Sequence, residues 1–187
     1  MFPNGGRVSH FDYQALQSYG EKRAGEELIP HTDATYRTIA QRDARGIEGF
    51  SAGGRGTARI MFRYADLFCS AVPMSGGHQH EKYIDEHEGR SQNPPNLVFE
   101  PGNNTYALAR RYAGQRSYEL NILIVVGTTD MNYGATLEWM THLDALNIGY
   151  KKILVEGVGH NLAAITGRAG LDVMRFHAES RARVAAG

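Results

Sequence analysis

The sequence has 187 residues, with 20 Lys plus Arg and 20 Asp plus Glu, so its formal net charge at pH 7 is zero. A balanced charge provides no basic field for nucleic acid or acidic lipid, and we expect a small neutral or uncharged polar ligand. This length is typical of one domain with its own core, and the one cysteine, Cys69, excludes an intrachain disulfide. No apolar run approaches the roughly 20 residues of a membrane span, so the sequence predicts a soluble cytoplasmic protein, or a secreted one whose signal peptide has been removed.

The first third of the chain alternates helical and extended patterns. Residues 1–20 are polar and lack a period after an early turn, which predicts the tail of a strand followed by a loop. A helix pattern over 21–38 is interrupted by Pro30, where we expect a kink. One side of this helix carries Leu28, Ile29, Thr32 and Tyr36. The patterns then predict, in order, a strand over 44–50, a helix over 56–64 and a strand over 68–74.

The rest of the chain continues this alternation. Residues 78–101 are polar, contain two adjacent prolines and show no strand period, which predicts a loop or a small cap in a single domain spanning 1–187. The remaining patterns are, in order, helix 104–112, strand 120–126, helix 135–146, strand 150–155 and helix 170–184. Strands that are apolar throughout and alternate with helices indicate an α/β fold, with a mostly parallel sheet covered by helices on both faces.

One short stretch has the spacing of a catalytic motif. Residues 49–53 read Gly-Phe-Ser-Ala-Gly and lie between a predicted strand and a predicted helix. This is the pattern of a nucleophile elbow, in which a serine on a sharp, strained turn needs small neighbours two positions before and after it. Gly49 and Gly53 are expected to supply that room for Ser51. A chain with 22 glycines also produces such a pattern by chance, so an ordinary turn is the alternative.

Two later strand ends carry an acid and a base. Asp130 follows the strand at 120–126 in the sequence Gly-Thr-Thr-Asp, and His160 follows the last strand in Glu-Gly-Val-Gly-His. Because the carboxyl ends of parallel strands lie at one edge of a sheet, we expect both side chains to meet Ser51 there. The order Ser, Asp, His is the one expected for an α/β-hydrolase. Taken alone, Asp130 would be a helix N-cap and His160 a surface or capping histidine.

Five segments together resemble a known esterase family. They are residues 27–38, the Gly-Phe-Ser-Ala-Gly-Gly motif at 49–54, Met-Ser-Gly-Gly at 74–77, and the loops at 127–130 and 157–160. The resemblance covers nearly the whole chain, and it is to the α/β-hydrolases that include esterase D and the feruloyl and acetylxylan esterases. It implies hydrolysis of carboxylic esters without a cofactor, with Ser51 as nucleophile, His160 as base and Asp130 as the acid that orients the base.

The chain departs from that family at its amino end. Family members have several strands and a helix before the segment that residues 1–5 match, so one edge of the sheet is expected to be open. A second copy of the chain, in a homodimer, or the segment 1–20 would cover that edge. The absent part also includes a loop that donates to the tetrahedral oxygen. The Ala52 N–H is the donor that the motif itself provides, and a second donor would come from Asn4, Gly5 or Gly6.

The substrate is expected to be a small-molecule or polymeric ester. Five residues are predicted to border the cleft because they closely follow Asp130 or the strand at 68–74. These are Gly77, His78, Met131, Asn132 and Tyr133. A reduced cap over 78–101 would leave the site open. An open site suits bulky aryl, feruloyl-type or polyester esters, alongside small acyl esters.

Three other interpretations remain open. A serine peptidase of related fold would use the same triad. A hydrolase-like protein without catalysis is the second, because the amino-terminal loop is absent. A metal site formed by His78, His80 and Glu81 with His87 is the third, although these residues lack a fixed ligand spacing and also fit a solvated loop. We therefore expect no metal.

Overall fold

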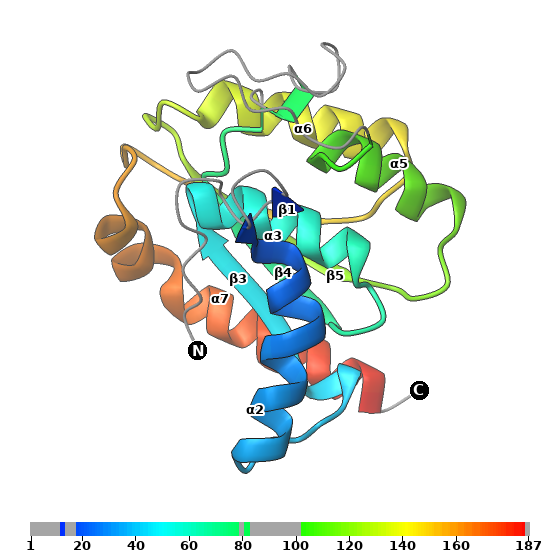
Figure 1. The fold of residues 1–187 in the computed structure, drawn as a ribbon. Helices are drawn as coiled ribbons and strands as arrows, with labels where there is room; N and C mark the ends of the chain where they lie inside the picture. The colour runs from blue at the N-terminus through cyan, green and yellow to red at the C-terminus, as the bar shows by residue number, and fades with distance from the viewer. Residues whose placement is uncertain (1–11, 14–17, 79–80, 83–101, 186–187) are drawn as a thin grey trace.

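The computed structural model describes residues 12–13, 18–78, 81–82 and 102–185 (Figure 1). In chain order the elements are β1 (Asp12–Tyr13), β2 (Ser18–Tyr19), α1 (Gly20–Lys22), a π-helical segment η3 (Arg23–Leu28), α2 (Ile29–Thr35), a 3-10 turn η4 (Arg42–Ala44), β3 (Gly46–Phe50), α3 (Ala52–Arg63), β4 (Ser70–Met74), α5 (Thr105–Gly114), β5 (Asn121–Gly127), α6 (Tyr133–Ala145), β6 (Lys151–Val155) and α7 (Leu162–Ala185). None of the described helices is long and apolar enough to cross a membrane.

The strands β3, β4, β5 and β6 form one parallel sheet, in that order. Phe50 of β3 is level with Met74 of β4, Met74 with Val125 of β5, and Val125 with Ile153 of β6. The strands therefore end at the same edge of the sheet, and the loops that follow β3, β5 and β6 leave from it. The predicted α/β fold with a parallel sheet is confirmed.

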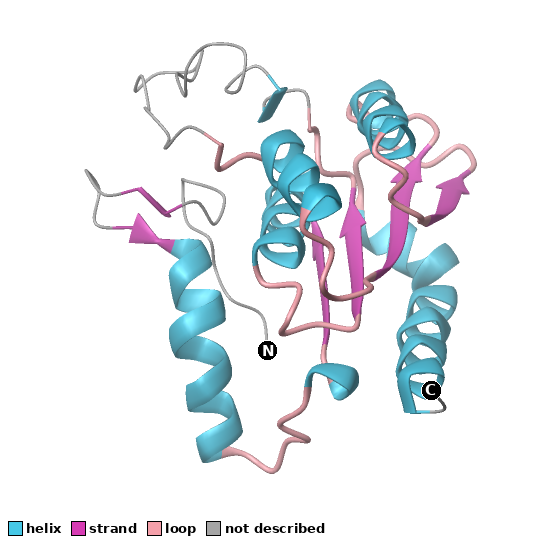
Figure 2. Cartoon of the chain, turned by 90° about the vertical axis from the view of Figure 1, so that its right-hand side faces the viewer, coloured by secondary structure: helices cyan, strands magenta, loops and turns pink. Residues whose placement is uncertain are grey.

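Helices cover both faces of this sheet (Figure 2). Successive residues of a strand point to opposite faces. In β4, Ala71 belongs to a buried cluster with side chains of α3, α5 and α6, whereas Val72 belongs to a second cluster with side chains of α7. The first cluster includes the fully buried Trp139 of α6, and the second includes Ile165 and Phe176 of α7. This two-sided burial explains why β4 and β5 read as continuous apolar runs.

The two outer strands do not follow the prediction that all strands are apolar. Glu48 in β3 is exposed, and so are Lys151 and Lys152 in β6. Each of these strands pairs on one side only within the described part of the sheet, β3 with β4 and β6 with β5. Charged side chains are tolerated at a sheet edge because water reaches them there.

The amino-terminal helix differs in detail from the prediction. It runs from Gly20 to Thr35, and its π-helical segment, Arg23–Leu28, ends two residues before Pro30. A proline clashes with the carbonyl group four residues before it, and a π-helical turn opens the helix at that point. The prediction that Tyr36 shares one side of the helix with Leu28, Ile29 and Thr32 was wrong, because the helix ends at Thr35, the backbone of Tyr36 is extended, and the residue is 60% exposed.

Residues 1–20 were expected to be a strand tail and a loop. Within the described part of this segment, β1 and β2 instead pair as two short antiparallel strands. The remaining residues of the segment, including the predicted donors Asn4, Gly5 and Gly6, lie outside the described residues.

The last helix begins earlier than predicted. α7 starts at Leu162 rather than at residue 170 and continues through Gly167 and Gly170. Ile165 and Ala169 lie one turn apart and are buried, so a helical face is present from its first turn. The Asn161 side chain accepts a hydrogen bond from the Ala164 N–H at 3.0 Å, which satisfies a free donor at the helix start. The two glycines concealed this stretch in the sequence.

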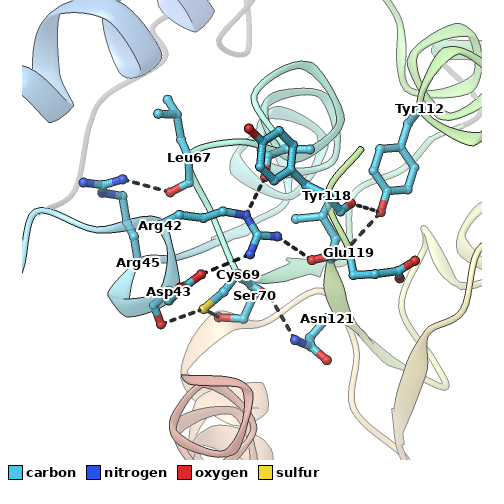
Figure 3. A network of polar contacts seen from close by, with 12 residues as sticks. Arg42, Asp43, Arg45, Leu67, Cys69, Ser70, Tyr112, Tyr118, Glu119 and Asn121 are labelled. Atoms are coloured by element: carbon cyan, nitrogen blue, oxygen red, sulfur yellow. Dashed lines mark hydrogen bonds and ion pairs between the residues drawn. The ribbon is translucent and has the colours of Figure 1, made fainter. Parts of the chain in front are cut away.

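A polar network holds the amino ends of the strands together (Figure 3). Arg42 donates from Nε to the Ala65 carbonyl at 3.0 Å and from Nη2 to the Glu119 carbonyl. Asn121, the first residue of β5, donates from Nδ2 to the carbonyl of Cys69, which precedes β4, at 3.1 Å. The network fixes the connections on the side of the sheet opposite the strand ends that carry Ser51, Asp130 and His160.

Candidate active site

Ser51 sits on a strained turn between β3 and α3. Its backbone dihedrals are φ 58° and ψ −119°, a positive φ that is uncommon for any residue other than glycine. The Ser51 N–H donates to the Met74 carbonyl at 2.9 Å, so the turn remains attached to β4. Such backbone strain costs on the order of 1–3 kcal/mol and occurs preferentially at functional sites.

The room for this turn comes from Gly49 and Gly54 rather than from Gly53. A Cβ atom added at Gly49 would lie 2.4 Å from the Gly53 carbonyl oxygen, and one added at Gly54 would lie 2.3 Å from the Met74 carbonyl oxygen. No such neighbour lies within 4 Å at Gly53. The prediction that Gly53 relieves crowding was therefore wrong, because the close approach of α3 to β4 occurs one residue later.

The structure brings Ser51, His160 and Asp130 together. His160 Nε2 lies 2.8 Å from Ser51 Oγ, and His160 Nδ1 lies 3.0 Å from each carboxylate oxygen of Asp130. The Asp130 side chain is fully buried, whereas the His160 side chain is 22% exposed. The ring of Phe50 lies 4.6 Å from the imidazole of His160. This arrangement allows a proton to pass from the serine hydroxyl to an imidazole held in a fixed orientation.

The loops that carry the acid and the base are packed against each other. The Thr129 N–H donates to the Val158 carbonyl at 3.1 Å, and the Gly157 N–H donates to Thr128 Oγ1 at 2.9 Å. A Cβ atom on Gly127 would lie 2.0 Å from the Val158 carbonyl oxygen, so only glycine fits at the end of β5. Asp130 and His160 are thus positioned as one unit.

A second serine also contacts a histidine, at the other end of the sheet. Ser70 Oγ lies 2.7 Å from His177 Nδ1, and His177 Nε2 lies 3.5 Å from a Glu48 carboxylate oxygen. Ser70 is completely buried at the start of β4, so a substrate cannot reach its hydroxyl group. Ser51 is partly accessible and stands on a strained turn. These differences make Ser51 the candidate nucleophile of the two.

The Ala52 N–H is at the first position of α3. The Arg55 N–H donates to the Ser51 carbonyl at 3.1 Å in the first turn of the helix, so the preceding N–H groups have no intrahelical acceptor. These groups and the helix dipole favour negative charge near Ser51.

Four of the five predicted cleft residues lie near the loop after β5. Met131 is 79% exposed and Tyr133 is partly exposed at the start of α6. Asn132 is buried, and its Nδ2 donates to the Ser75 carbonyl at 3.0 Å. Gly77 has φ +61°, and a Cβ atom there would lie 2.6 Å from Asn132 Oδ1. Asn132, not Asp130, is the N-cap residue of α6.

His78 is in the interior instead of at the surface of a cleft. Its ring stacks on Trp139 with centroids 4.0 Å apart, and it is 1% exposed. Burial, with smaller contributions from Arg55 and Arg59, lowers the pKa of His78 to about 3. The imidazole is therefore neutral at physiological pH.

The predicted metal-binding residues are only partly described. Glu81 pairs with Arg59 at 2.5 Å, and both side chains are buried. The other residues proposed with His78 and Glu81, namely His80 and His87, lie outside the described residues, as does most of the predicted cap at 78–101. Within the described ranges, no group of three or more His, Cys, Asp or Glu side chains is arranged to hold a metal ion.

An open groove of about 700 Å³ follows the outer side of β3, between α3 and α7. It begins at Phe50, next to Ser51, and continues past Ile47 to His177. Its walls include Leu162 and Met174, which are 48% and 68% exposed. The sequence predicted an open sheet edge. Leu162 was not predicted as part of the wall because it lies in the first turn of α7, before the predicted helix start at residue 170.

Comparison of sequences finds one short similarity. No protein-family model matches the chain. Two esterases of Mycobacterium tuberculosis, MT1326 and Rv1288, are 32% identical to it over 81 residues. That match covers 41% of this chain and 18% of each esterase. The matched region is thus under a fifth of the length of these curated relatives.

Comparison of structures extends over most of the chain. An S-formylglutathione hydrolase of Staphylococcus aureus superimposes with a TM-score of 0.68 and 21% identity, covering 88% of this chain and 64% of that one. A ferulic acid esterase gives 0.71 and 20%, covering 92% and 64%. A fluorophosphonate-binding serine hydrolase of Staphylococcus aureus gives 0.78 and 18%, covering 94% and 69%. The chain therefore has the α/β-hydrolase fold, and the solved structures that share this fold with it include esterases.

Proposed function

We propose that this protein is a serine carboxylic-ester hydrolase. The observation that carries the proposal is the hydrogen-bonded connection from Ser51 Oγ through the imidazole of His160 to the carboxylate of Asp130. The strained elbow at Ser51 and the esterases among the similar proteins support it. The alternative of an ordinary glycine-rich turn does not explain why an acid and a base lie in line with the serine.

In the proposed reaction, Ser51 Oγ attacks the ester carbonyl carbon while His160 Nε2 accepts the hydroxyl proton. Asp130 stabilises the imidazolium, and the Ala52 N–H donates to the tetrahedral oxygen. The intermediate collapses to an acyl-enzyme, and the alcohol leaves with the proton from His160. Water then attacks the acyl carbon, with His160 again accepting a proton, and the carboxylic acid is released as Ser51 is regenerated.

We assign bulky aryl, feruloyl-type or polyester esters to this site, together with small acyl esters. Two observations support an open site: the exposed Met131 beside Asp130 and the groove that begins at Phe50. The names of two similar structures, a ferulic acid esterase and an S-formylglutathione hydrolase, agree with aryl and small acyl groups respectively.

A fluorophosphonate probe followed by peptide mapping tests this function. We expect covalent labelling at Ser51 alone, and turnover in a panel of p-nitrophenyl acetate, methyl ferulate and an aromatic polyester. Turnover of peptides in preference to these esters would favour the related serine peptidase. A protein that neither reacts with the probe nor hydrolyses any ester would be a hydrolase-like protein without catalysis.

We further propose that a second copy of the chain covers the β3 edge in a homodimer. Within the described residues β3 pairs only with β4, and the groove beside it exposes Leu162 and Met174. An unpaired strand next to apolar side chains is a surface that proteins usually cover. Sedimentation velocity is expected to show a dimer at high protein concentration, and a monomer at every concentration would contradict this proposal.

A further inference from the structure

The loop after β5 contains one buried asparagine, Asn132, that donates two hydrogen bonds, one from its backbone and one from its side chain. The backbone N–H of Asn132 donates to Asp130 Oδ1 at 2.8 Å. The side chain of the same residue donates from Nδ2 to the carbonyl of Ser75 at 3.0 Å. Asn132 is 8% exposed, so water has little access to the donors and acceptors of these two hydrogen bonds. One residue therefore connects the acid of the triad to the loop that follows β4.

The loop after β4 is shaped around this contact. Ser75 has φ 49°, and its N–H donates to the Val125 carbonyl at 2.9 Å, so its position relative to β5 is fixed. Two residues later, Gly77 brings its backbone so close that a Cβ atom would meet Asn132 Oδ1 at 2.6 Å. The strained Ser75 and the glycine at residue 77 thus let the loop pack closely around the Asn132 side chain.

The orientation of the Asp130 carboxylate depends on the donors that its two oxygen atoms face. Its Oδ1 is within hydrogen-bond reach of both the Asn132 N–H and His160 Nδ1, while Oδ2 lies 3.0 Å from His160 Nδ1. A carboxylate that accepts from a fixed backbone N–H cannot rotate about χ2 without losing that bond. If the Asn132 backbone shifts, the plane of the carboxylate shifts with it, and so does the imidazole.

We propose that Asn132 is a positioning residue, which holds the Asp130 carboxylate in the plane of the His160 imidazole through its anchor on Ser75. This inference rests on the proposed ester hydrolysis for its kinetic consequence, but not for its structural one. It also gives Asn132 a different role from the predicted contact with substrate. A substrate-binding residue would change KM, whereas a positioning residue changes kcat.

The test begins with Asn132→Ala. Misplacement of a catalytic group by about 1 Å costs on the order of 10²-fold, and we expect kcat for p-nitrophenyl acetate to fall about 10- to 100-fold with KM unchanged. The matched control is Asn104→Ala. Asn104 is also a buried asparagine, and its side chain accepts from the Tyr106 and Ala107 N–H groups to cap α5, away from the triad. The control is expected to lose stability but to keep kcat.

Gly77→Ala provides a double-mutant cycle. Its added Cβ would displace the Asn132 side chain, so the single variant is expected to lower kcat much as Asn132→Ala does. The double variant has no Asn132 side chain for this Cβ to displace. Alanine at φ +61° remains strained there and is expected to lower stability, whereas the combined loss in kcat is expected to be close to that of Asn132→Ala alone. Losses that multiply in the double variant would overturn the proposal.

A readout without substrate separates this inference from the proposed function. The His160 Nδ1 proton, hydrogen-bonded to Asp130, is expected to give a low-field proton NMR signal, which the variant His160→Gln would assign by removing it. We expect Asn132→Ala to shift or broaden this signal and Asn104→Ala to leave it unchanged. If the His160 Nδ1 signal of Asn132→Ala is the same as that of the wild type, the positioning role is overturned, whatever the enzyme hydrolyses. If the wild type is inert to esters and to fluorophosphonate, but Asn132→Ala still changes the NMR signal, the positioning role is supported and the proposed function is refuted.

Discussion

Replacing Ser51 with alanine is expected to lower kcat for ester hydrolysis by about 10⁴- to 10⁶-fold, because the change removes the hydroxyl group that forms the acyl-enzyme in the proposed reaction. The same change should alter the free energy of unfolding by less than about 1 kcal/mol. Alanine keeps the Cβ atom, so the strain at φ 58° persists, and only the hydrogen bond from Ser51 Oγ to His160 is lost. Activity on p-nitrophenyl acetate and urea unfolding measure the two effects.

Ser70→Ala is the matched control for this experiment. It also removes a serine hydroxyl that lies within hydrogen-bond distance of a histidine, here His177 at 2.7 Å. Because Ser70 is completely buried, this variant should lose about 1–3 kcal/mol of stability and retain its kcat. Ser51→Ala is thus expected to lose activity and keep its stability, whereas Ser70→Ala is expected to lose stability and keep its activity. Wild-type turnover in Ser51→Ala would refute the assignment of the nucleophile.

Replacing Asp130 with asparagine is expected to lower kcat by about 10⁴-fold with little change in the fold. The reason lies in the neighbouring hydrogen bond. The Asn132 N–H requires an acceptor, so the amide oxygen of the new side chain takes the place of Oδ1 and its NH₂ group faces His160 Nδ1. An NH₂ donor there forces Nδ1 to be unprotonated and places the imidazole proton on Nε2. That tautomer cannot accept the proton of Ser51.

Asp172→Asn serves as the control for loss of a carboxylate. Asp172 lies on the exposed side of α7 and pairs with Arg175 at 3.1 Å, so its replacement should leave kcat unchanged. Steady-state kinetics on both variants distinguish a local effect on His160 from a general effect of charge. Equal activities for the two variants would show that Asp130 does not orient the base.

The features that the sequence predicted correctly depend on local patterns. β4 and β5 are buried on both faces and read as continuous apolar runs, and α6 has regularly spaced apolar side chains. The meeting of Ser51, Asp130 and His160 was also predictable, because each follows a strand and parallel strands end on one edge. The catalytic roles of these residues remain a prediction that the variants above test.

The features that were missed depend on contacts between distant segments. The need for glycine at residue 54 comes from the Met74 carbonyl, and the fit of Asn132 comes from Ser75 and Gly77. Neither contact leaves a periodic signal in the sequence. His78 was expected at a cleft because of its place after β4, but its interior position depends on stacking with Trp139, which is on a later helix.

The three triad residues lie far apart in the sequence, so the site forms only when the whole sheet has folded. Ser51 and His160 are 109 residues apart, and their contact requires that all strands from β3 to β6 be in register. A folding intermediate that contained only β3, α3 and β4 would present the serine without its base. The rate of fluorophosphonate labelling in increasing denaturant would therefore report the fraction of molecules whose sheet is complete, even where circular dichroism detects only the amount of helix and strand.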